Sequence, residues 1–341
     1  MHLVETLIYA SEKAARIARS CCRGRGESLL VSEKESDANP RFDKDFKTIA
    51  DVLAQESAKA FIVSRIPELA NNVRGEECAE IGGITISLKE TEDETVALLK
   101  LILPEETARY MAEAAHGDVT DIQIESLQEL LNLDYSDLGV WIDPIDGTAE
   151  FISGIHGNAE SGHGLPCVTV LIGAYLKSTG EPIAGVINQP FFNGSKVKIV
   201  WGVNYGDQKY YSSNIGNDQG KKVILMSSSE NPAVINEFRN LGWEIDSVPG
   251  AGHKLLKVAS GEASAYIVSK GTTFKWDTCG PHSIICALGG NILSYKGLSP
   301  LQYNDPNDLD TQEYCNKDGI VAFTNNDILK EIKEIVCKLN A

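Results

Sequence analysis

The sequence predicts a mixed α/β (α+β) protein, and three observations along its 341 residues support that fold class. Apolar residues recur at helical spacing near the N-terminus, over residues 3–22 and again over residues 46–66. Residues 139–213 contain apolar segments joined by short connections, which is typical of an antiparallel sheet. From residue 220 onward, strand-like and helix-like segments alternate, which predicts a βα unit with a partly parallel sheet.

The first part of the chain supplies mainly helices. The helix predicted over residues 3–22 has one apolar face, made of Leu3, Leu7, Ala10, Ala14, Ile17 and Ala18. A polar segment follows, and we expect an exposed loop over residues 23–41, whose place before Asp51 suggests a lid or a metal-binding segment. After the helix at 46–66, the pattern predicts a strand at 71–80, a hairpin at 81–89, a helix at 90–103 and a polar, helical region that contains a loop at 105–137.

The remaining chain supplies most of the strands. Two strands within residues 167–192 are joined by the turn sequence K-S-T-G-E-P, and residues 197–213 form another hairpin. The alternating part predicts strands at 222–229, 243–249, 264–269, 291–295 and 319–324, and helices at 231–242, 252–262, 276–290 and 326–339. We place a boundary within residues 213–221, which separates an N-terminal α+β domain, 1–215, from a C-terminal α/β domain, 216–341.

The charge balance narrows the classes of partner. The chain has 31 Lys and Arg residues against 48 Asp and Glu residues, a formal net charge of −17. A nucleic-acid polymer is not expected as a partner, because phosphate backbones are bound by clusters of Lys and Arg. A small anionic substrate remains compatible, but it needs a local positive charge, which a bound metal ion supplies.

Cysteine usage and hydropathy favour a cytoplasmic protein. The eight cysteines form no C-x-x-C pair, so they predict neither that kind of zinc site nor a disulfide scaffold, and we expect reduced thiols: Cys21, Cys22, Cys78, Cys167, Cys279, Cys286, Cys315 and Cys337. The N-terminal segment carries Glu5 and Glu12, which predicts an amphipathic helix rather than a signal peptide. No run of about 18 apolar residues occurs, so we expect no membrane span and no membrane partner.

Acidic residues stand at the ends of several predicted elements, each beside Gly, Thr or Trp. They are Asp51 in "DFKTIAD", Glu76 and Glu77 in "RGEE", Asp143 and Asp146 in "DPIDGT", and Asp277 in "FKWD". Packed carboxylates repel one another and are costly to desolvate unless a cation compensates them. A set of oxygen ligands suits a hard cation such as Mg²⁺.

The spacing in "DPIDGT" is informative because two carboxylates three residues apart, across a Pro-containing turn, can face one point. The carbonyl of Ile145 between them can face the same point. Gly147 allows close approach of the backbone, and Thr148 then begins a helix whose free N–H groups suit a phosphate.

Each motif alone also has a structural interpretation. "DPIDG" is compatible with a plain turn and helix cap, "GEE" with a solvated helix start, and "KWD" says little. Lys254 on a predicted helix is compatible with a solvent-facing lysine, and His282 with a packed or solvated histidine rather than a zinc ligand. The joint occurrence of the acidic motifs, in this order, favours a functional site.

These motifs resemble the lithium-sensitive, magnesium-dependent phosphomonoesterases of the inositol monophosphatase-like superfamily. Their pattern is D-P-[IL]-D-[GS]-T with an upstream G-E-E and a downstream W-D, and all three occur here in that order. "SEKAARIAR", "DFKTIADVL", "CVTVLIG", "GVINQPF" and "TTFKWD" resemble the inositol polyphosphate 1-phosphatase branch, whereas "DPIDGTAEF", "GEASAYIVS" and "WDTCGPH" are as similar to the bisphosphate nucleotidase branch. The resemblance implies a layered α-β-α-β-α sandwich.

The resemblance also implies roles for individual residues. Glu76, Asp143 and the Ile145 carbonyl would hold one Mg²⁺, and Asp143, Asp146 and Asp277 a second. Glu77 lies beside the site and would bind metal directly or through water, so we expect two or three ions in total. Asp51 and Thr148 would orient and deprotonate the attacking water.

Substrate contacts follow from the same resemblance. The N–H groups of Gly147 and Thr148 would take the scissile phosphate, and the rest of the substrate would meet Ser229, Gly250, Ala251, Lys254 and Thr272. The chain departs from the branch at Asn231, where a lysine is expected, and this leaves the exact substrate open.

The implied activity is removal of the 1-phosphate from inositol polyphosphates such as inositol 1,4-bisphosphate, with inhibition by lithium. The alternative is a 3′(2′),5′-bisphosphate nucleotidase acting on 3′-phosphoadenosine 5′-phosphate, or a dual activity. A catalytically silent metal or sugar-phosphate binder has no use for the Asp51–Thr148 pair, and a protein with a merely acidic surface predicts no stabilisation by Mg²⁺. We expect a monomer.

Overall fold

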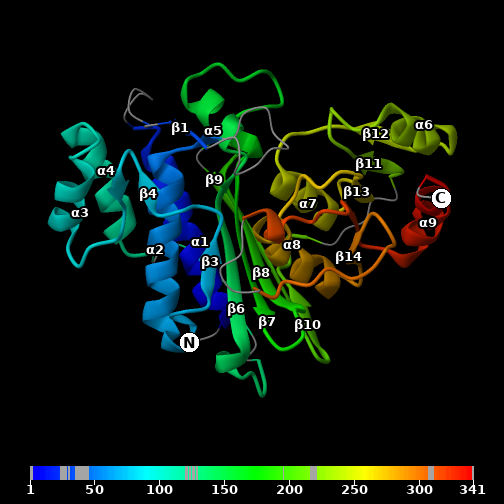
Figure 1. Cartoon of the computed structure of the whole chain (residues 1–341), viewed down its shortest axis with the longest axis horizontal. Coiled ribbons are helices and arrows are strands. Elements are labelled where there is room, and N and C mark those ends of the chain that lie inside the picture. The colour runs from blue at the N-terminus through cyan, green and yellow to red at the C-terminus, as the bar shows by residue number, and fades with distance from the viewer. Residues whose placement is uncertain are drawn as a thin grey trace.

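Two large β-sheets, two small two-stranded sheets and the helices around them make up the described part of the computed structural model (Figure 1). It describes residues 3–23, 29, 31–34, 46–119, 122, 124, 127, 130–194, 196–215, 221–305 and 311–339. Most of the loop predicted over residues 23–41 therefore lies outside the described residues.

The first sheet has six strands in the order β10-β9-β8-β7-β6-β3. Their bounds are β3 Val73–Gly75, β6 Leu138–Asp146, β7 Thr169–Leu176, β8 Pro182–Phe192, β9 Lys196–Tyr205 and β10 Gln208–Tyr211. Strands β6 to β10 are antiparallel neighbours, which confirms the predicted antiparallel sheet. Strand β3 pairs parallel to β6, because the long segment between them crosses back over the sheet.

The second sheet has five strands in the order β12-β11-β13-β15-β14. Their bounds are β11 Val223–Leu225, β12 Glu244–Asp246, β13 Ala265–Val268, β14 Asn291–Ser294 and β15 Ile320–Phe323. Strand β11 runs parallel to β12 and β13, and β15 runs antiparallel to β13 and β14. The sheet is therefore partly parallel, as the alternation of elements predicts.

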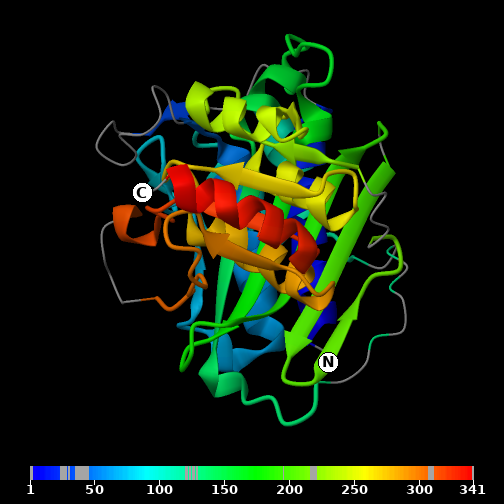
Figure 2. The same cartoon turned by 90° about the vertical axis from the view of Figure 1, so that its right-hand side faces the viewer.

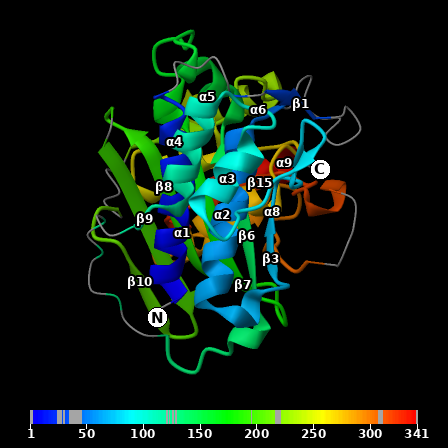
Figure 3. The same cartoon turned by 90° about the vertical axis from the view of Figure 1, so that its left-hand side faces the viewer.

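Helices form three layers around the two sheets. The outer layer on the first sheet holds α1 Leu3–Ser20 and α2 Ile49–Arg65, with α3 Glu92–Leu99 and α4 Glu105–His116 beside them (Figure 3). The middle layer holds α7 Ala251–Ala259 and α8 Lys275–Ala287, and the far layer holds α6 Pro232–Asn240 and α9 Asn326–Leu339 (Figure 2). The predicted mixed class and layered α-β-α-β-α arrangement are confirmed.

Buried side chains explain why the layers hold together. One cluster joins Leu171 and Ile187 of the first sheet to Leu255 of α7, Ile285 of α8 and Val268 of the second sheet. The middle helices are therefore apolar on both sides. In the outer layer, helix α1 is also buried round most of its surface, because α2, α4 and strand β8 pack against it. A second cluster packs α6 and α9 on the opposite face of the second sheet.

Short elements complete the fold. They are β1 Ser32–Glu33, β2 Phe46–Lys47, β4 Glu80–Ile81, β5 Ile84–Thr85, α5 Thr148–Ile155, and the 3-10 turns η1 Pro67–Leu69, η2 Tyr135–Asp137, η3 Leu165–Cys167 and η4 Thr311–Tyr314. Strand β1, inside the predicted loop, pairs antiparallel with β2.

Helix α4 ends at His116, earlier than the predicted helical region at 105–137. The two-domain division stays a prediction. Among the described residues, every helix is too short or too polar to span a bilayer.

Candidate active site

The stretch "DPIDGT" lies where strand β6 ends and helix α5 begins. Asp143 pairs with Leu171 and Asp146 with Thr169, so β6 has one residue more than β7 between these pairs. In a regular strand, residues three apart point to opposite faces, and the extra residue brings both aspartates to the same side. Gly147 then turns the chain in the left-handed conformation, with φ 86°, as the N-cap of α5.

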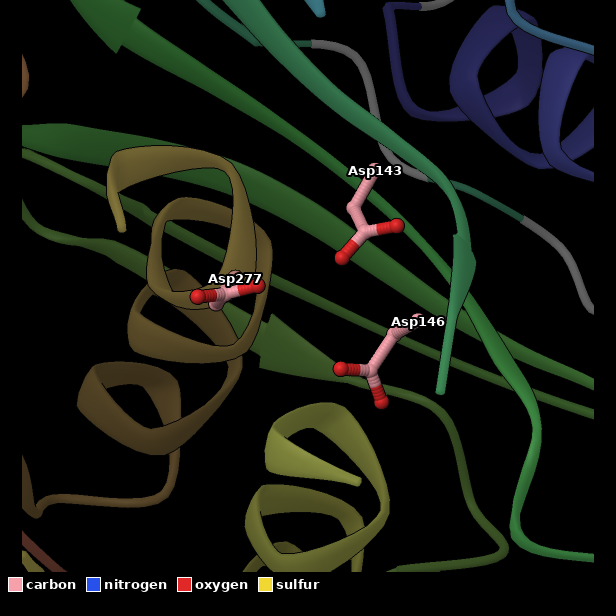
Figure 4. Close-up of side chains that lie close together, drawn as sticks. All are labelled: Asp143, Asp146 and Asp277. Atoms are coloured by element: carbon pink, nitrogen blue, oxygen red, sulfur yellow. The ribbon is translucent and has the colours of Figure 1, made fainter. Parts of the chain in front are cut away.

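Three buried carboxylates meet at this point. Asp143, Asp146 and Asp277 each offer an oxygen, and these oxygens lie within 4.8 Å of one another (Figure 4). Asp277 comes from the first turn of α8, where its Oδ2 accepts a hydrogen bond of 2.6 Å from the backbone N–H of Phe274. The structure thus brings together three aspartates that the sequence analysis predicts as metal ligands.

Asp146 also anchors the start of helix α7. Its Oδ2 accepts hydrogen bonds of 3.0 Å from Thr169 Oγ1 and from the backbone N–H of Gly252. Its Oδ1 accepts a hydrogen bond of 3.2 Å from the N–H of Ala251. The Ala251 N–H, on a residue predicted to contact substrate, therefore donates to Asp146.

The acidic pair Glu76–Glu77 follows strand β3 and closes one side of the site. The N–H of Glu76 donates to the carbonyl of Ile142 in β6, which extends the β3–β6 pairing by one residue. The Lys34 ammonium lies 2.6 Å from Glu76 Oε1 and 2.8 Å from Glu77 Oε1. Burial raises the pKa of Glu77 well above its usual range, although Lys34 opposes that shift.

The predicted water-activating pair is in contact. Thr148 Oγ1 lies 3.2 Å from Asp51 Oδ1 and 3.2 Å from the carbonyl of Ile145. The other oxygen of Asp51 accepts hydrogen bonds from the N–H and hydroxyl of Thr48, at 2.7 and 2.5 Å, in a capping box at the start of α2. Burial raises the pKa of Asp51 from 3.8 to about 6.

The chemistry of these groups fits a divalent cation. Burial, followed by the charges of Glu76, Asp146 and Asp277, raises the pKa of Asp143 well above its usual range. Asp143 Oδ1 is buried and has no hydrogen-bond partner among the described residues. A buried acceptor without a hydrogen-bond donor destabilises the fold, and carboxylates clustered without a cation repel one another. Oxygen ligands of this kind suit Mg²⁺.

A cavity of about 290 Å³ opens onto the carboxylates. Eleven predicted site residues line it: Glu76, Asp143, Ile145, Asp146, Gly147, Thr148, Gly250, Ala251, Lys254, Thr272 and Asp277. Asp51 and Glu77 lie behind this lining, 1% and 5% exposed. Ser229 does not line the cavity, and its Oγ instead lies 3.0 Å from that of Ser227, which does.

Lys254 and His282 are both buried and hydrogen-bonded. Lys254 is 7% exposed, its Nζ donates to the carbonyl of Gly250 at 3.1 Å, and the ammonium lies over the ring of Tyr266. A solvent-facing lysine is therefore the wrong interpretation, and burial lowers the pKa of Lys254. His282 is packed, with its ring nitrogens 2.9 Å from Tyr303 Oη and 2.7 Å from Asn291 Oδ1.

Several residues that the sequence analysis does not single out also belong to the site: Lys34, Phe46, Thr48, Thr169, Ser227 and Thr273. Thr48 has a sequence signal, because it stands three residues before Asp51 in the spacing of a capping box. Lys34 has no such sequence signal, because it lies in a polar segment and the β1–β2 pairing is what brings it to Glu76 and Glu77.

A buried carboxylate cluster that opens onto a cavity of about 290 Å³, on a five-layer α-β-α-β-α fold, is typical of a class of metal-binding proteins. The chain belongs to the inositol monophosphatase family, whose sequence pattern matches residues 4–335. The superfamily predicted from the motifs is confirmed.

Individual relatives are similar over nearly the whole chain. An inositol polyphosphate 1-phosphatase of Mus musculus is 34% identical over 368 residues, covering 93% of this chain and 92% of the relative. A 3′(2′),5′-bisphosphate nucleotidase 1 of Mus musculus is 28% identical, covering 96% and 92%. The solved structure of an IMPase/NADP phosphatase complexed with Mg²⁺ and phosphate shares the fold, with a TM-score of 0.54, 12% identity and coverage of 92% and 87%. The higher identity to the first relative favours the predicted branch.

Proposed function

We propose that the chain is a Mg²⁺-dependent phosphomonoesterase that removes the 1-phosphate from inositol polyphosphates. The observation that carries this proposal is the orphaned, buried Oδ1 of Asp143, within a cluster of carboxylates that also lines a substrate-sized cavity. A purely structural cluster would satisfy this oxygen with a donor from the protein. We further propose that the protein works in the cytoplasm as a monomer.

The acidic residues would hold the cation in two groups. Glu76, Asp143 and the Ile145 carbonyl would form one site, and Asp143, Asp146 and Asp277 the other. Glu77, beside Lys34, would be available to a further ion, so the donor set is compatible with two or three ions. Bound Mg²⁺ supplies positive charge for the phosphate oxygens and makes a neighbouring water more acidic.

The phosphate would lie at the start of helix α5. Gly147 and Thr148 line the cavity, and the first N–H groups of a helix have no partners within it. These N–H donors favour a bound anion. The neighbouring carboxylates would repel that anion unless the cation compensates their negative charge. The backbone therefore orients the phosphate toward Asp51 and Thr148.

Asp51 and Thr148 would handle the water proton. The Thr148 hydroxyl, held between Asp51 Oδ1 and the Ile145 carbonyl, can accept a hydrogen bond from a water in the cavity. The proton would pass through this hydroxyl to Asp51, whose raised pKa of about 6 suits a general base near neutral pH.

The alternative substrate class is a 3′,5′-bisphosphorylated nucleoside. The 28% identity to a bisphosphate nucleotidase supports this class. The 34% identity to an inositol polyphosphate 1-phosphatase is higher and favours the inositol polyphosphate. Asn231, which caps α6 beside Ser229, supplies no cation where the branch has a lysine. Ring selectivity would then depend on Lys254, Thr272 and the Ser227–Ser229 turn.

A substrate panel tests the proposal. Phosphate release is measured with saturating Mg²⁺ on inositol 1,4-bisphosphate, inositol 1-phosphate and 3′-phosphoadenosine 5′-phosphate. We expect the highest kcat/KM on the first, and inhibition by millimolar lithium. Faster release from the nucleotide would favour the alternative, and no release from any of the three would contradict a phosphomonoesterase.

A further inference from the structure

Gln55 in helix α2 binds both backbone groups of Glu77 with one side chain. Its Nε2 donates to the Glu77 carbonyl at 2.5 Å, and its Oε1 accepts from the Glu77 N–H at 2.8 Å. The side chain is fully buried. The carboxamide therefore acts as a strand partner for a residue that lies past the end of β3, where the pairing with β6 stops at Glu76.

Gly75 leaves the space that this contact needs. A Cβ added at Gly75 would lie 2.0 Å from Gln55 Oε1 and 2.4 Å from Gln55 Cδ, so no side chain fits there beside the amide. The backbone of Gly75 is not in the left-handed region, so glycine is required here for space and not for conformation. A glycine before the acidic pair and a glutamine on the facing helix are two parts of one contact.

The chemistry of the contact selects glutamine. An amide offers a donor and an acceptor on one plane, whereas a carboxylate offers acceptors only and an aliphatic side chain offers neither. A glutamate here would also place a negative charge beside Glu77, whose carboxylate is already costly to bury. Gln55 follows Asp51 by one helical turn, so the same helix holds the acid that contacts Thr148 and the amide that holds the acidic pair.

We propose that Gln55 is a positioning residue for metal binding: it fixes the Glu77 peptide, and with it the placement of the Glu76 carboxylate at the cavity and of the Glu77 carboxylate behind it. This inference rests on the proposed function, in which those carboxylates hold Mg²⁺. Residues that orient metal ligands typically contribute about 10- to 100-fold to metal affinity. Loss of the amide should weaken Mg²⁺ binding while the buried core of α2 is kept.

The test measures the Mg²⁺ dissociation constant by titration calorimetry on the purified metal-free protein. We expect Gln55→Leu to raise it about 10-fold or more. Ser57→Ala, a buried change on the same helix at a hydroxyl without a hydrogen-bond partner among the described residues, serves as the matched control and should leave it unchanged. If Gln55→Leu does not fold, Gln55→Asn replaces it, because its shorter amide cannot reach both Glu77 groups.

A double-mutant cycle separates positioning from simple packing. Gly75→Ala alone should weaken Mg²⁺ binding because its methyl group displaces the Gln55 amide. In a Gln55→Ala background the three atoms nearest to the added methyl group are absent, so the same change should add little further loss. Additive losses, or a Gln55 variant that lowers the melting temperature but binds Mg²⁺ as the wild type does, would overturn the inference. A wild type that binds no Mg²⁺ would instead contradict the proposed function itself.

Discussion

Asp51 shows how one carboxylate can serve both folding and chemistry. One of its oxygens completes the capping box of α2 with Thr48, and the other contacts the Thr148 hydroxyl. The Thr-x-x-Asp spacing predicts the capping role, because a capping box involves residues close together in the sequence. The contact with Thr148 joins residues 97 positions apart and could be expected only from the resemblance.

Replacing Asp51 with Asn tests its role as general base. The amide keeps one oxygen for the Thr48 cap, so we expect Asp51→Asn to fold, but it cannot accept the water's proton. We predict a fall in kcat of about 10²- to 10⁴-fold, with Mg²⁺ binding retained. The control is Asp134→Asn, at the exposed cap of η2, which should leave kcat unchanged. Wild-type turnover by Asp51→Asn would remove Asp51 from the mechanism.

At the scale of elements, the β1–β2 pairing places residues in the site that no periodic pattern in the sequence predicts. Each strand is two residues long, too short for a detectable alternation, and the surrounding sequence is polar. Phe46 from β2 lines the cavity, and Lys34, just after β1, lies between Glu76 and Glu77. By contrast, α5, α7 and α8 were predictable near their observed starts, because caps and apolar spacing are local signals.

Lys34 should compete with Mg²⁺ for the acidic pair. Its ammonium compensates two carboxylates in the metal-free protein, so Lys34→Met should lower the melting temperature without metal. It should also lower the Mg²⁺ concentration for half-maximal thermal stabilisation by up to about tenfold, which corresponds to about 1.4 kcal/mol. Lys59→Met, which removes a lysine paired with Glu56 on the outer part of α2, is the control. A higher Mg²⁺ requirement in Lys34→Met would show that Lys34 supports the ion instead.

For the whole molecule, the site forms where layers meet. Asp143 and Asp146 come from the end of a strand in the first sheet, Asp277 from the middle layer, and Asp51 from the outer helices. Periodicity predicted the sheets and most helices, but not the parallel pairing of β3 with β6, because strand order depends on contacts far apart in the sequence. The layered arrangement was expected from the resemblance, which carries that long-range information.

The buried acids give the metal-free protein an unusual dependence of stability on pH. Burial raises the pKa of Asp51 to about 6 and also raises the pKa values of Glu77, Asp143 and Asp277, so these acids bind more protons in the folded state than in the unfolded state. Burial lowers the pKa of His253 and of His282 to about 4, so these histidines oppose the effect of the acids below about pH 6.5, the ordinary pKa of histidine. Above that pH the acids dominate, and we predict a melting temperature in EDTA that decreases from about pH 6.5 to about pH 8.

Excess Mg²⁺ provides the matched comparison. The cation compensates the ionised acids, so the melting temperature with Mg²⁺ should change much less over the same pH range, and the stabilisation by Mg²⁺ should grow with pH. A melting temperature in EDTA that rises over this range would show that the acids are ionised and otherwise compensated in the metal-free fold.

Mg²⁺ titration of the metal-free wild type and of Asp143→Asn, followed by calorimetry and by melting temperature, tests the metal site most directly. Asp143 belongs to both proposed groups of ligands, and its Oδ1 has no hydrogen-bond partner among the described residues. We predict that the wild type binds Mg²⁺ and is stabilised by it. Asp143→Asn should melt higher than the wild type in EDTA, because one repulsive charge is gone, yet gain little from Mg²⁺ and release no phosphate. Equal Mg²⁺ binding by the two proteins, or none by the wild type, would contradict the account.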